Sequence, residues 1–239
     1  MKVVIMAAGR GTRISRHLQG RPKCTIDING VPLIKRTFDL LSKKENTDIS
    51  IVTGYNEHIV LDSIKGHKFT KFFNPFFDVT NSIVSLWFAK DFIPDNDDLI
   101  VMNGDVFFER SVLDVVYAEQ KDPVMLADSS RIKEADYKFN WDKNNVLKKY
   151  GKELSEQETT GEYVGFAKIS KNFIPQFKSK LTEMINTQNH HKWWEDVLYS
   201  FTAEGKNIYI KDIKDLFWAE VDYVEDYERI IEAFKHRSF

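Results

Sequence analysis

The feature that most constrains the fold of this sequence is a short apolar run at residues 3–6, which ends abruptly in small residues and glycines. An uninterrupted apolar run predicts a strand buried on both faces, as in a parallel sheet, because a strand with one wet face would alternate apolar and polar residues. The run is far shorter than the roughly 20 residues of a membrane-spanning helix, and glycines break it before it resembles a signal peptide. We therefore expect the first strand of an α/β sheet here.

Strand and helix patterns alternate through the first half of the chain. The further elements that we expect are helices at residues 32–43, 56–64 and 81–90, and strands at residues 48–54, 69–73 and 98–102. Strands that alternate with helices of this length are joined by crossover connections, which place them side by side and parallel. The sequence therefore predicts an α/β fold with a doubly wound, mostly parallel, Rossmann-like sheet.

The pattern changes after about residue 122. Shorter elements follow, with strands expected at residues 124–127, 146–150, 162–169 and 207–212, and helices at residues 174–186, 194–204 and 224–235. Because no repeat or low-complexity linker separates the two halves, we predict a single domain over residues 1–239, in which residues 123–239 form a small mixed-sheet extension.

Charge and cysteine content exclude several classes of protein. The 34 Lys and Arg residues nearly balance the 36 Asp and Glu residues, and no long basic run predicts a nucleic-acid surface. Cys24 is the one cysteine, so no internal disulfide can form, and a reducing compartment, the cytoplasm, is expected. We expect no membrane partner, and the sequence is compatible with a monomer or a homodimer.

The loop after the first strand has the composition of a phosphate-binding turn. Gly9 and Gly11 would let the backbone approach an anion closely and present its N–H groups. A dinucleotide fingerprint would need a glycine where Ile14 stands, and the Gly-Lys-Ser/Thr of a P-loop is missing too. The loop is therefore a phosphate site of another kind, or else a glycine turn with incidental basic residues.

The full motif narrows this choice. Ala-Ala-Gly-Arg-Gly-Thr-Arg at residues 7–13, followed by Pro22 and Lys23, resembles the signature of the sugar-phosphate nucleotidylyltransferase family. The resemblance implies that the loop holds a nucleoside triphosphate through Ala7, Ala8, Gly9, Gly11 and Thr12, and that two cations, Arg13 and Lys23, neutralise its phosphates. Such cations are needed because an anionic phosphate attacks another phosphate in this reaction. Residues 1–122 would then be the nucleotide-binding half and residues 123–239 the acceptor-binding half.

Two aspartates match the metal ligands of that family. Asp105 follows an apolar strand, and Asp222 precedes the last expected helix. Mg²⁺ takes one or two carboxylates together with phosphate oxygens and water, so the resemblance implies a Mg²⁺ site formed by this pair. The alternatives are a turn aspartate at residue 105 and a helix N-cap at residue 222.

The segment around residue 81 resembles that of the short cytidylyltransferases of the phosphocholine type. Asn81, Ser82 and Ser85 offer donors and acceptors for the edge of a cytosine base. Capping of the helix that follows is the alternative role of Asn81.

Residues of the second half resemble the acceptor site of the same short enzymes. Lys152, Glu162 and Gly165 match positions near the acceptor in these enzymes. Two indoles beside two carboxylates suit a cationic head group, and these residues are Trp193, Trp194, Glu195 and Asp196. Neighbouring residues of a helix point in different directions, so we expect one of the two indoles to belong to the core.

Together these motifs predict a Mg²⁺-dependent cytidylyltransferase. It would join CTP to a small phosphorylated acceptor, phosphocholine or a similar amine-bearing phosphomonoester, and release pyrophosphate. Phosphoglutamine, aminoethylphosphonate and a hexose 1-phosphate are alternative acceptors. A glycosyltransferase and a non-catalytic nucleotide-sensing domain are the alternatives from other classes.

Overall fold

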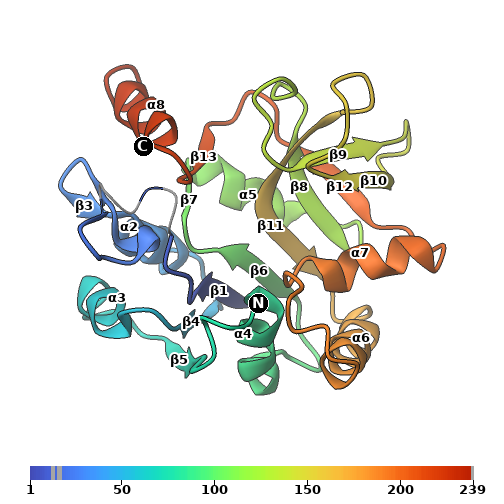
Figure 1. The fold of residues 1–239 in the computed structure, drawn as a ribbon, viewed down its shortest axis with the longest axis horizontal. Coiled ribbons are helices and arrows are strands. Elements are labelled where there is room, and N and C mark those ends of the chain that lie inside the picture. The colour runs from blue at the N-terminus through green and yellow to red at the C-terminus, as the bar shows by residue number, and fades with distance from the viewer. Residues whose placement is uncertain (12–13, 15–17, 238–239) are drawn as a thin grey trace.

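A nine-stranded sheet runs through the part of the chain that the computed structural model describes, residues 1–11, 14 and 18–237 (Figure 1). Its centre is formed by β1 (Lys2–Ala7), which pairs in parallel with β4 (Asp48–Thr53) on one side and β6 (Leu99–Asn103) on the other. The edge strand β5 (Thr70–Phe73) pairs in parallel with β4. The predicted doubly wound, mostly parallel sheet is confirmed.

Successive residues of β1 point to opposite faces of this sheet, and each face has its own hydrophobic core. Val3 and Ile5 pack under α2 (Leu33–Leu41), α3 (Glu57–Ser63) and α5 (Arg110–Ala118). Val4 and Met6 pack under α4 (Ser82–Phe88), α6 (Ile174–Asn186) and α7 (Asp196–Ala203). Burial on both faces is the physical reason for the uninterrupted apolar run at the start of the chain.

The second half extends the same sheet with antiparallel strands. The long strand β11 (Gly161–Ile169) pairs antiparallel with β6 and also with β8 (Val124–Asp128) and β9 (Lys138–Trp141). Next to these lie β10 (Leu147–Gly151), antiparallel to β9, and β12 (Tyr209–Asp212), parallel to β8. The mixed-sheet extension is therefore part of the main sheet.

Several short elements lie outside the nine-stranded sheet. A separate two-stranded sheet joins β7 (Val106–Phe108) to β13 (Trp218–Glu220), and α8 (Val224–Phe234) follows it. The turn of β2 (Asp27–Ile28) and β3 (Val31–Pro32) lies near α8 in Figure 1. Short 3₁₀ turns occupy Lys23–Thr25 and Lys90–Phe92.

Several elements differ from the sequence predictions. The helix α5 and the strands β7 and β9 were not predicted, and α7 begins at Asp196 instead of residue 194. Residues 194 and 195 form a turn before α7, and the backbone N–H of Trp194 donates to the Ser82 hydroxyl on α4 at 2.9 Å. Among the described residues, no helix is long and apolar enough to cross a membrane.

We expect Gly165→Ala to destabilise the protein by about 2–4 kcal/mol, because it combines a left-handed backbone with a crowded position. Gly165 has a φ of +87°, and an added Cβ would lie 2.8 Å from Val106 Cγ2. Gly205, with a φ of +75° and no atom near an added Cβ, gives the matched control. In urea unfolding, Gly205→Ala should lower the free energy of unfolding by only about 1 kcal/mol. An equal decrease for the two variants would contradict the expected clash, because it would mean that the atoms around Gly165 move aside for the added Cβ.

Candidate active site

A cavity of about 460 Å³ opens at the carboxyl ends of β1 and β6, the edge at which open α/β sheets bind ligands. Its walls come from both halves of the chain. The described residues that line it are Met6, Ala8, Gly9, Gly11, Lys23, Phe77, Thr80, Asn81, Ser82, Ser85, Asn103, Asp105, Asp136, Tyr137, Lys152, Tyr163, Trp193, Glu195, Tyr199, Glu220 and Asp222.

The glycine loop forms the wall next to β1. Ala8, Gly9 and Gly11 line the cavity, whereas Ala7 ends β1 and packs in the core below the loop. Gly11 has a φ of +69°, and an added Cβ would lie 2.5 Å from Lys23 Cβ. A glycine is thus required for the loop to pass against Lys23. Thr12 and Arg13, which the sequence predicts to bind phosphate, lie outside the described residues.

Lys23 lies between the two predicted metal carboxylates. Its ammonium is 2.5 Å from Asp105 Oδ2 and also donates to Asp222 Oδ1. Burial lowers the pKa of Lys23, but the charges of Asp105 and Asp222 outweigh it and hold that pKa well above its usual range. The lysine is therefore a fixed positive charge at the base of the cavity.

Strand pairing brings Asp222 to Asp105 from a distant part of the chain. β13 pairs antiparallel with β7, with Glu220 opposite Val106, and the N–H of Val221 donates to the Asp105 carbonyl at 3.0 Å. Glu220 is enclosed beside the same groups, and burial raises its pKa well above the ordinary value. The cluster thus contains three carboxyl groups around one lysine.

The expected alternative role for Asp222, capping of the last helix, falls to another residue. The N-cap of α8 is Tyr223, and Asp226 accepts from the backbone N–H groups of both Asp222 and Tyr223. The carboxylate of Asp222 points instead to Lys23.

Asp105 and Asp222 suit a divalent cation. Their oxygens converge on one cationic group, and a hard ion such as Mg²⁺ binds one or two carboxylates while phosphates and water complete its shell. Among the described residues no group of three or more His, Cys, Asp or Glu side chains forms a metal site alone. A metal here would therefore depend on oxygen atoms of the substrate.

Asn81, Ser82 and Ser85 line the cavity but also hold the structure together. The Asn81 side chain accepts from the N–H of Ser82, so it does cap α4, and it donates to the His191 carbonyl at 3.2 Å. The hydroxyl of Ser85 accepts from Asn74 Nδ2 at 2.9 Å. A base bound here would meet side chains whose orientations are already fixed.

Of the predicted acceptor residues Lys152, Glu162 and Gly165, the described cavity wall contains Lys152. Lys152 lines the cavity and pairs with Asp136 at 2.7 Å. Glu162 is absent from the described cavity wall, because its carboxylate binds Arg131 and accepts from the N–H of Asp136 at 2.7 Å. Glu162 thus supports the loop that carries Asp136. Gly165 packs against β6 and β7, and it too is absent from the described wall.

Only some of the predicted tryptophan and carboxylate residues line the cavity. Trp194 is fully buried, as expected for one of the two indoles, whereas Trp193 is 43% exposed and lines the cavity. Glu195 lines it as well, and burial raises its pKa to about 8. Asp196 starts α7 and accepts from the N–H of Trp193 at 2.8 Å, outside the described wall.

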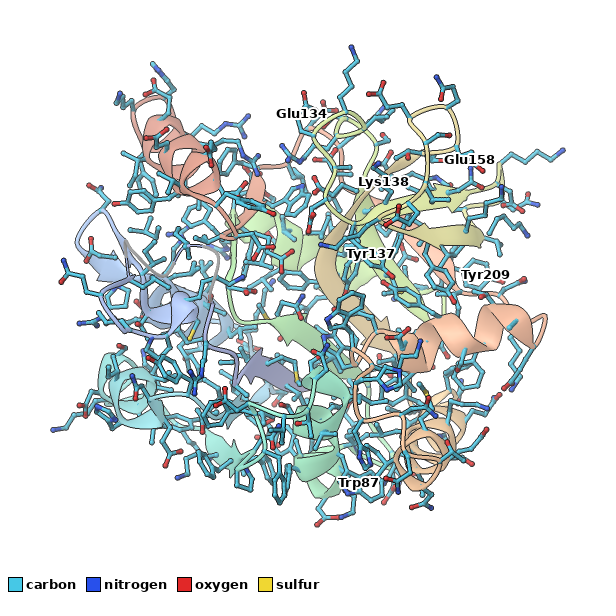
Figure 2. The ribbon with its side chains drawn as sticks, in the orientation of Figure 1. Trp87, Glu134, Tyr137, Lys138, Glu158 and Tyr209 are labelled. Carbon is cyan, nitrogen blue, oxygen red and sulfur yellow. The ribbon has the colours of Figure 1, made fainter. Side chains whose placement is uncertain are left out.

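Sequence reasoning missed several residues of the wall, namely Asn103, Asp136, Tyr137, Tyr163, Tyr199 and Glu220. In Figure 2 Tyr137 lies near the middle of the view, whereas Glu134 and Glu158 lie on loops in its upper part. One signal was available for Glu220, because it stands two residues before Asp222 at the end of a strand, where residues i and i+2 share a side. The tyrosines had no comparable signal.

A glycine loop, a fixed lysine and paired carboxylates on a doubly wound sheet define the site of an enzyme that acts on nucleotides. Residues 3–168 match the model of the MobA-like NTP transferase domain, and the chain belongs to this family of nucleotidyltransferases. The family generally uses a divalent metal.

The curated relatives include cytidylyltransferases that match almost from end to end. The chain is 23% identical to CTP:phosphoglutamine cytidylyltransferase from Campylobacter jejuni, over 97% of this chain and 100% of the relative. It is 25% identical to choline-phosphate cytidylyltransferase from Haemophilus influenzae, over 97% of each. The fold matches that of CTP:phosphocholine cytidylyltransferase from Streptococcus pneumoniae with a TM-score of 0.77, at 18% identity and 98% coverage of each chain. The predicted resemblance to short cytidylyltransferases is confirmed.

Glu195 makes stability depend on pH. Because its pKa is about 8 in the folded protein against an ordinary value of 4.5, folding retains a proton that the unfolded chain releases. The resulting stabilisation is complete when the pH is below the pKa of Glu195 in the unfolded chain. It is lost as the pH rises through the pKa of Glu195 in the folded protein. Relative to Glu195→Gln, the wild-type protein should lose roughly 1–4 kcal/mol of unfolding free energy between about pH 5 and about pH 9. Urea unfolding measures this, and parallel pH profiles for the two proteins would contradict a protonated Glu195.

Proposed function

We propose that this protein is a Mg²⁺-dependent cytidylyltransferase that joins CTP to a small amine-bearing phosphomonoester, phosphocholine or a similar compound, and releases pyrophosphate. The observation that carries the proposal is the position of Lys23, which lies against Gly11 of the loop and between Asp105 and Asp222. The relatives that act with CTP on phosphoglutamine and on choline phosphate support the nucleotide and the class of acceptor. The single buried cysteine suits a reducing compartment, and we place the enzyme in the cytoplasm.

The reaction needs positive charge at the point where two anions meet. The acceptor phosphate oxygen attacks the α-phosphorus of CTP, a bond to phosphorus forms, and the bond to the pyrophosphate leaving group breaks. Lys23 would offset the charge on the phosphates, and the glycine loop would bind them through backbone N–H groups. Asp105 and Asp222 would hold Mg²⁺, which supplies further positive charge beside the triphosphate when bound.

The wall of the cavity favours an acceptor with a positive head group. Glu195 is buried, and it lines the cavity together with Asp136 and the aromatic rings of Trp193 and Tyr137. A buried carboxylate is costly unless a cation or donor faces it. The other classes have less support, because a metal-dependent glycosyltransferase normally has Asp-x-Asp where this chain has Asn103-Gly104-Asp105, and a sensing domain needs no paired carboxylates.

We expect CTP to give the fastest release of pyrophosphate among the four nucleoside triphosphates. The assay combines each nucleotide and Mg²⁺ with phosphocholine, phosphoethanolamine, aminoethylphosphonate, phosphoglutamine or a hexose 1-phosphate. Turnover with an amine-bearing acceptor and CTP is the expected result. No turnover with any pair would refute the enzyme activity, and a preference for a hexose 1-phosphate would refute the proposed acceptor class.

Asp105→Asn and Asp222→Asn should each lower kcat by about 100-fold or more, because each removes one metal-binding carboxylate while the side-chain size is kept. Steady-state pyrophosphate release measures the loss, and circular dichroism checks the fold. Asp62→Asn is the matched control, since Asp62 is exposed on α3 and away from the cavity. An Asp105→Asn enzyme with wild-type kcat would contradict the metal role.

A further inference from the structure

We propose that the site selects an acceptor whose head-group nitrogen carries N–H bonds, a primary ammonium, over one whose nitrogen is fully methylated. The inference rests on the proposed function, which includes both kinds of amine, and it names the one that the cavity fits. It follows from the arrangement of Glu195, Asn103 and Tyr163 in the cavity wall.

Glu195 is a buried carboxyl group with few hydrogen-bond donors around it. It is 6% exposed and lines the cavity. The structure gives this carboxylate one side-chain hydrogen bond, a long one from Asn103 Nδ2 to Oε1 at 3.3 Å. Burial keeps this group protonated while the cavity is empty, and a bound cation would favour its ionised form, which can accept about four hydrogen bonds. A buried acceptor without hydrogen bonds is unfavourable in free energy. The cavity therefore presents carboxyl oxygen atoms that can be stabilised by donors from a ligand.

The orientation of the Asn103 amide is fixed from the other side. The indole N–H of the buried Trp194 donates to Asn103 Oδ1 at 2.8 Å. An indole nitrogen can only donate, so the amide oxygen must face Trp194 and the amide nitrogen must face Glu195. Asn103 therefore supplies one donor and cannot rotate to satisfy the carboxylate in another way.

A second polar group next to Glu195 is also incompletely bonded. The hydroxyl of Tyr163 is buried and forms no well-oriented hydrogen bond with a described group. Burial, followed by the charge of Glu195, raises the pKa of Tyr163 well above the ordinary value. The Tyr163 hydroxyl lies beside Glu195, where its O–H can donate to the carboxyl group while its oxygen accepts from a ligand. Two neighbouring oxygen atoms of the wall therefore suit a ligand with several N–H groups.

The faces of most aromatic rings in the wall already have aromatic neighbours. Tyr199 stacks with Tyr150 at a centroid distance of 4.2 Å and with Tyr137 at 5.9 Å, and Tyr163 stacks with Phe139 at 5.1 Å. A methylated cation binds best to open ring faces. Trp193 is the most exposed of the rings that line the cavity, and one face of its neighbour Tyr137 is covered by Tyr199, so few open faces remain for a methylated cation.

The two kinds of head group therefore interact differently with the same wall. Both carry a positive charge that Glu195 and Trp193 can attract. A primary ammonium also donates to Glu195 and Tyr163, and these charge-assisted bonds are the stronger part of the interaction. Each methyl group removes one donor and adds volume next to a carboxylate that then stays without its partner.

The test is a methylation series at constant phosphate: phosphoethanolamine, its N-methyl and N,N-dimethyl derivatives, and phosphocholine, each with CTP and Mg²⁺. We expect kcat/KM to fall along the series, by about 10- to 100-fold between the two ends, the effect of losing one hydrogen bond to a charged group. Calorimetric binding of the same four compounds should rank them in the same order. Equal or better use of phosphocholine would overturn the inference and leave the proposed function intact.

Variants separate this selection from a general loss of activity. Glu195→Gln should reduce the ratio of kcat/KM between the two ends of the series to within about threefold, since a neutral amide no longer prefers a donor cation. Tyr163→Phe should reduce the ratio in part. The control is Tyr209→Phe on β12, outside the cavity wall, which should leave both the ratio and the rate unchanged (Figure 2). An unchanged ratio in Glu195→Gln would also overturn the inference.

The binding measurement distinguishes the two possible failures. If no compound of the series gives pyrophosphate with any nucleotide but binding still follows the expected order, the proposed reaction fails and the selection for N–H donors stands. If none of the four binds, both are wrong.

Discussion

The contact of the Lys23 ammonium with Asp105 and Asp222 is the interaction on which the site depends. It joins three distant parts of the chain, because Lys23 follows the glycine loop, Asp105 follows a central strand and Asp222 lies 199 residues after Lys23. Carboxylates enclosed this closely would repel one another, and the lysine offsets that repulsion. The same contact fixes the cation where the phosphates of a substrate would lie.

Much of the fold follows from local sequence. The apolar runs predict β1, β4 and β6, since both faces of these central strands are buried and most of their positions hold apolar residues. The long amphipathic helix α6 matches its predicted bounds. The exact start of a helix is harder to predict, as at residues 194 and 195, which form a turn before α7 and pack against α4 through the bond from Trp194 to Ser82.

The candidate site was predictable in part for the same reason. Residues that directly follow a strand or belong to the glycine loop, such as Gly11, Lys23 and Asp105, can be found from one segment of sequence. Tyr137 and Tyr199 enter the wall only because β9, β11 and α7 meet there, and their spacing in the chain carries no sign of it. Glu162 is the opposite example. It stands beside the cavity-lining Tyr163 in the sequence, but its carboxylate accepts from the N–H of Asp136 and supports the loop that carries Asp136.

The pairing of β7 with β13 has a consequence for the order in which the enzyme is made. The glycine loop and Asp105 belong to residues 1–122, whereas Glu220 and Asp222 are synthesised much later. A nascent chain can thus form the parallel strands of the sheet while its site still lacks the second carboxylate. The cluster of carboxyl groups around Lys23 is complete only once β13 has been made and has paired with β7.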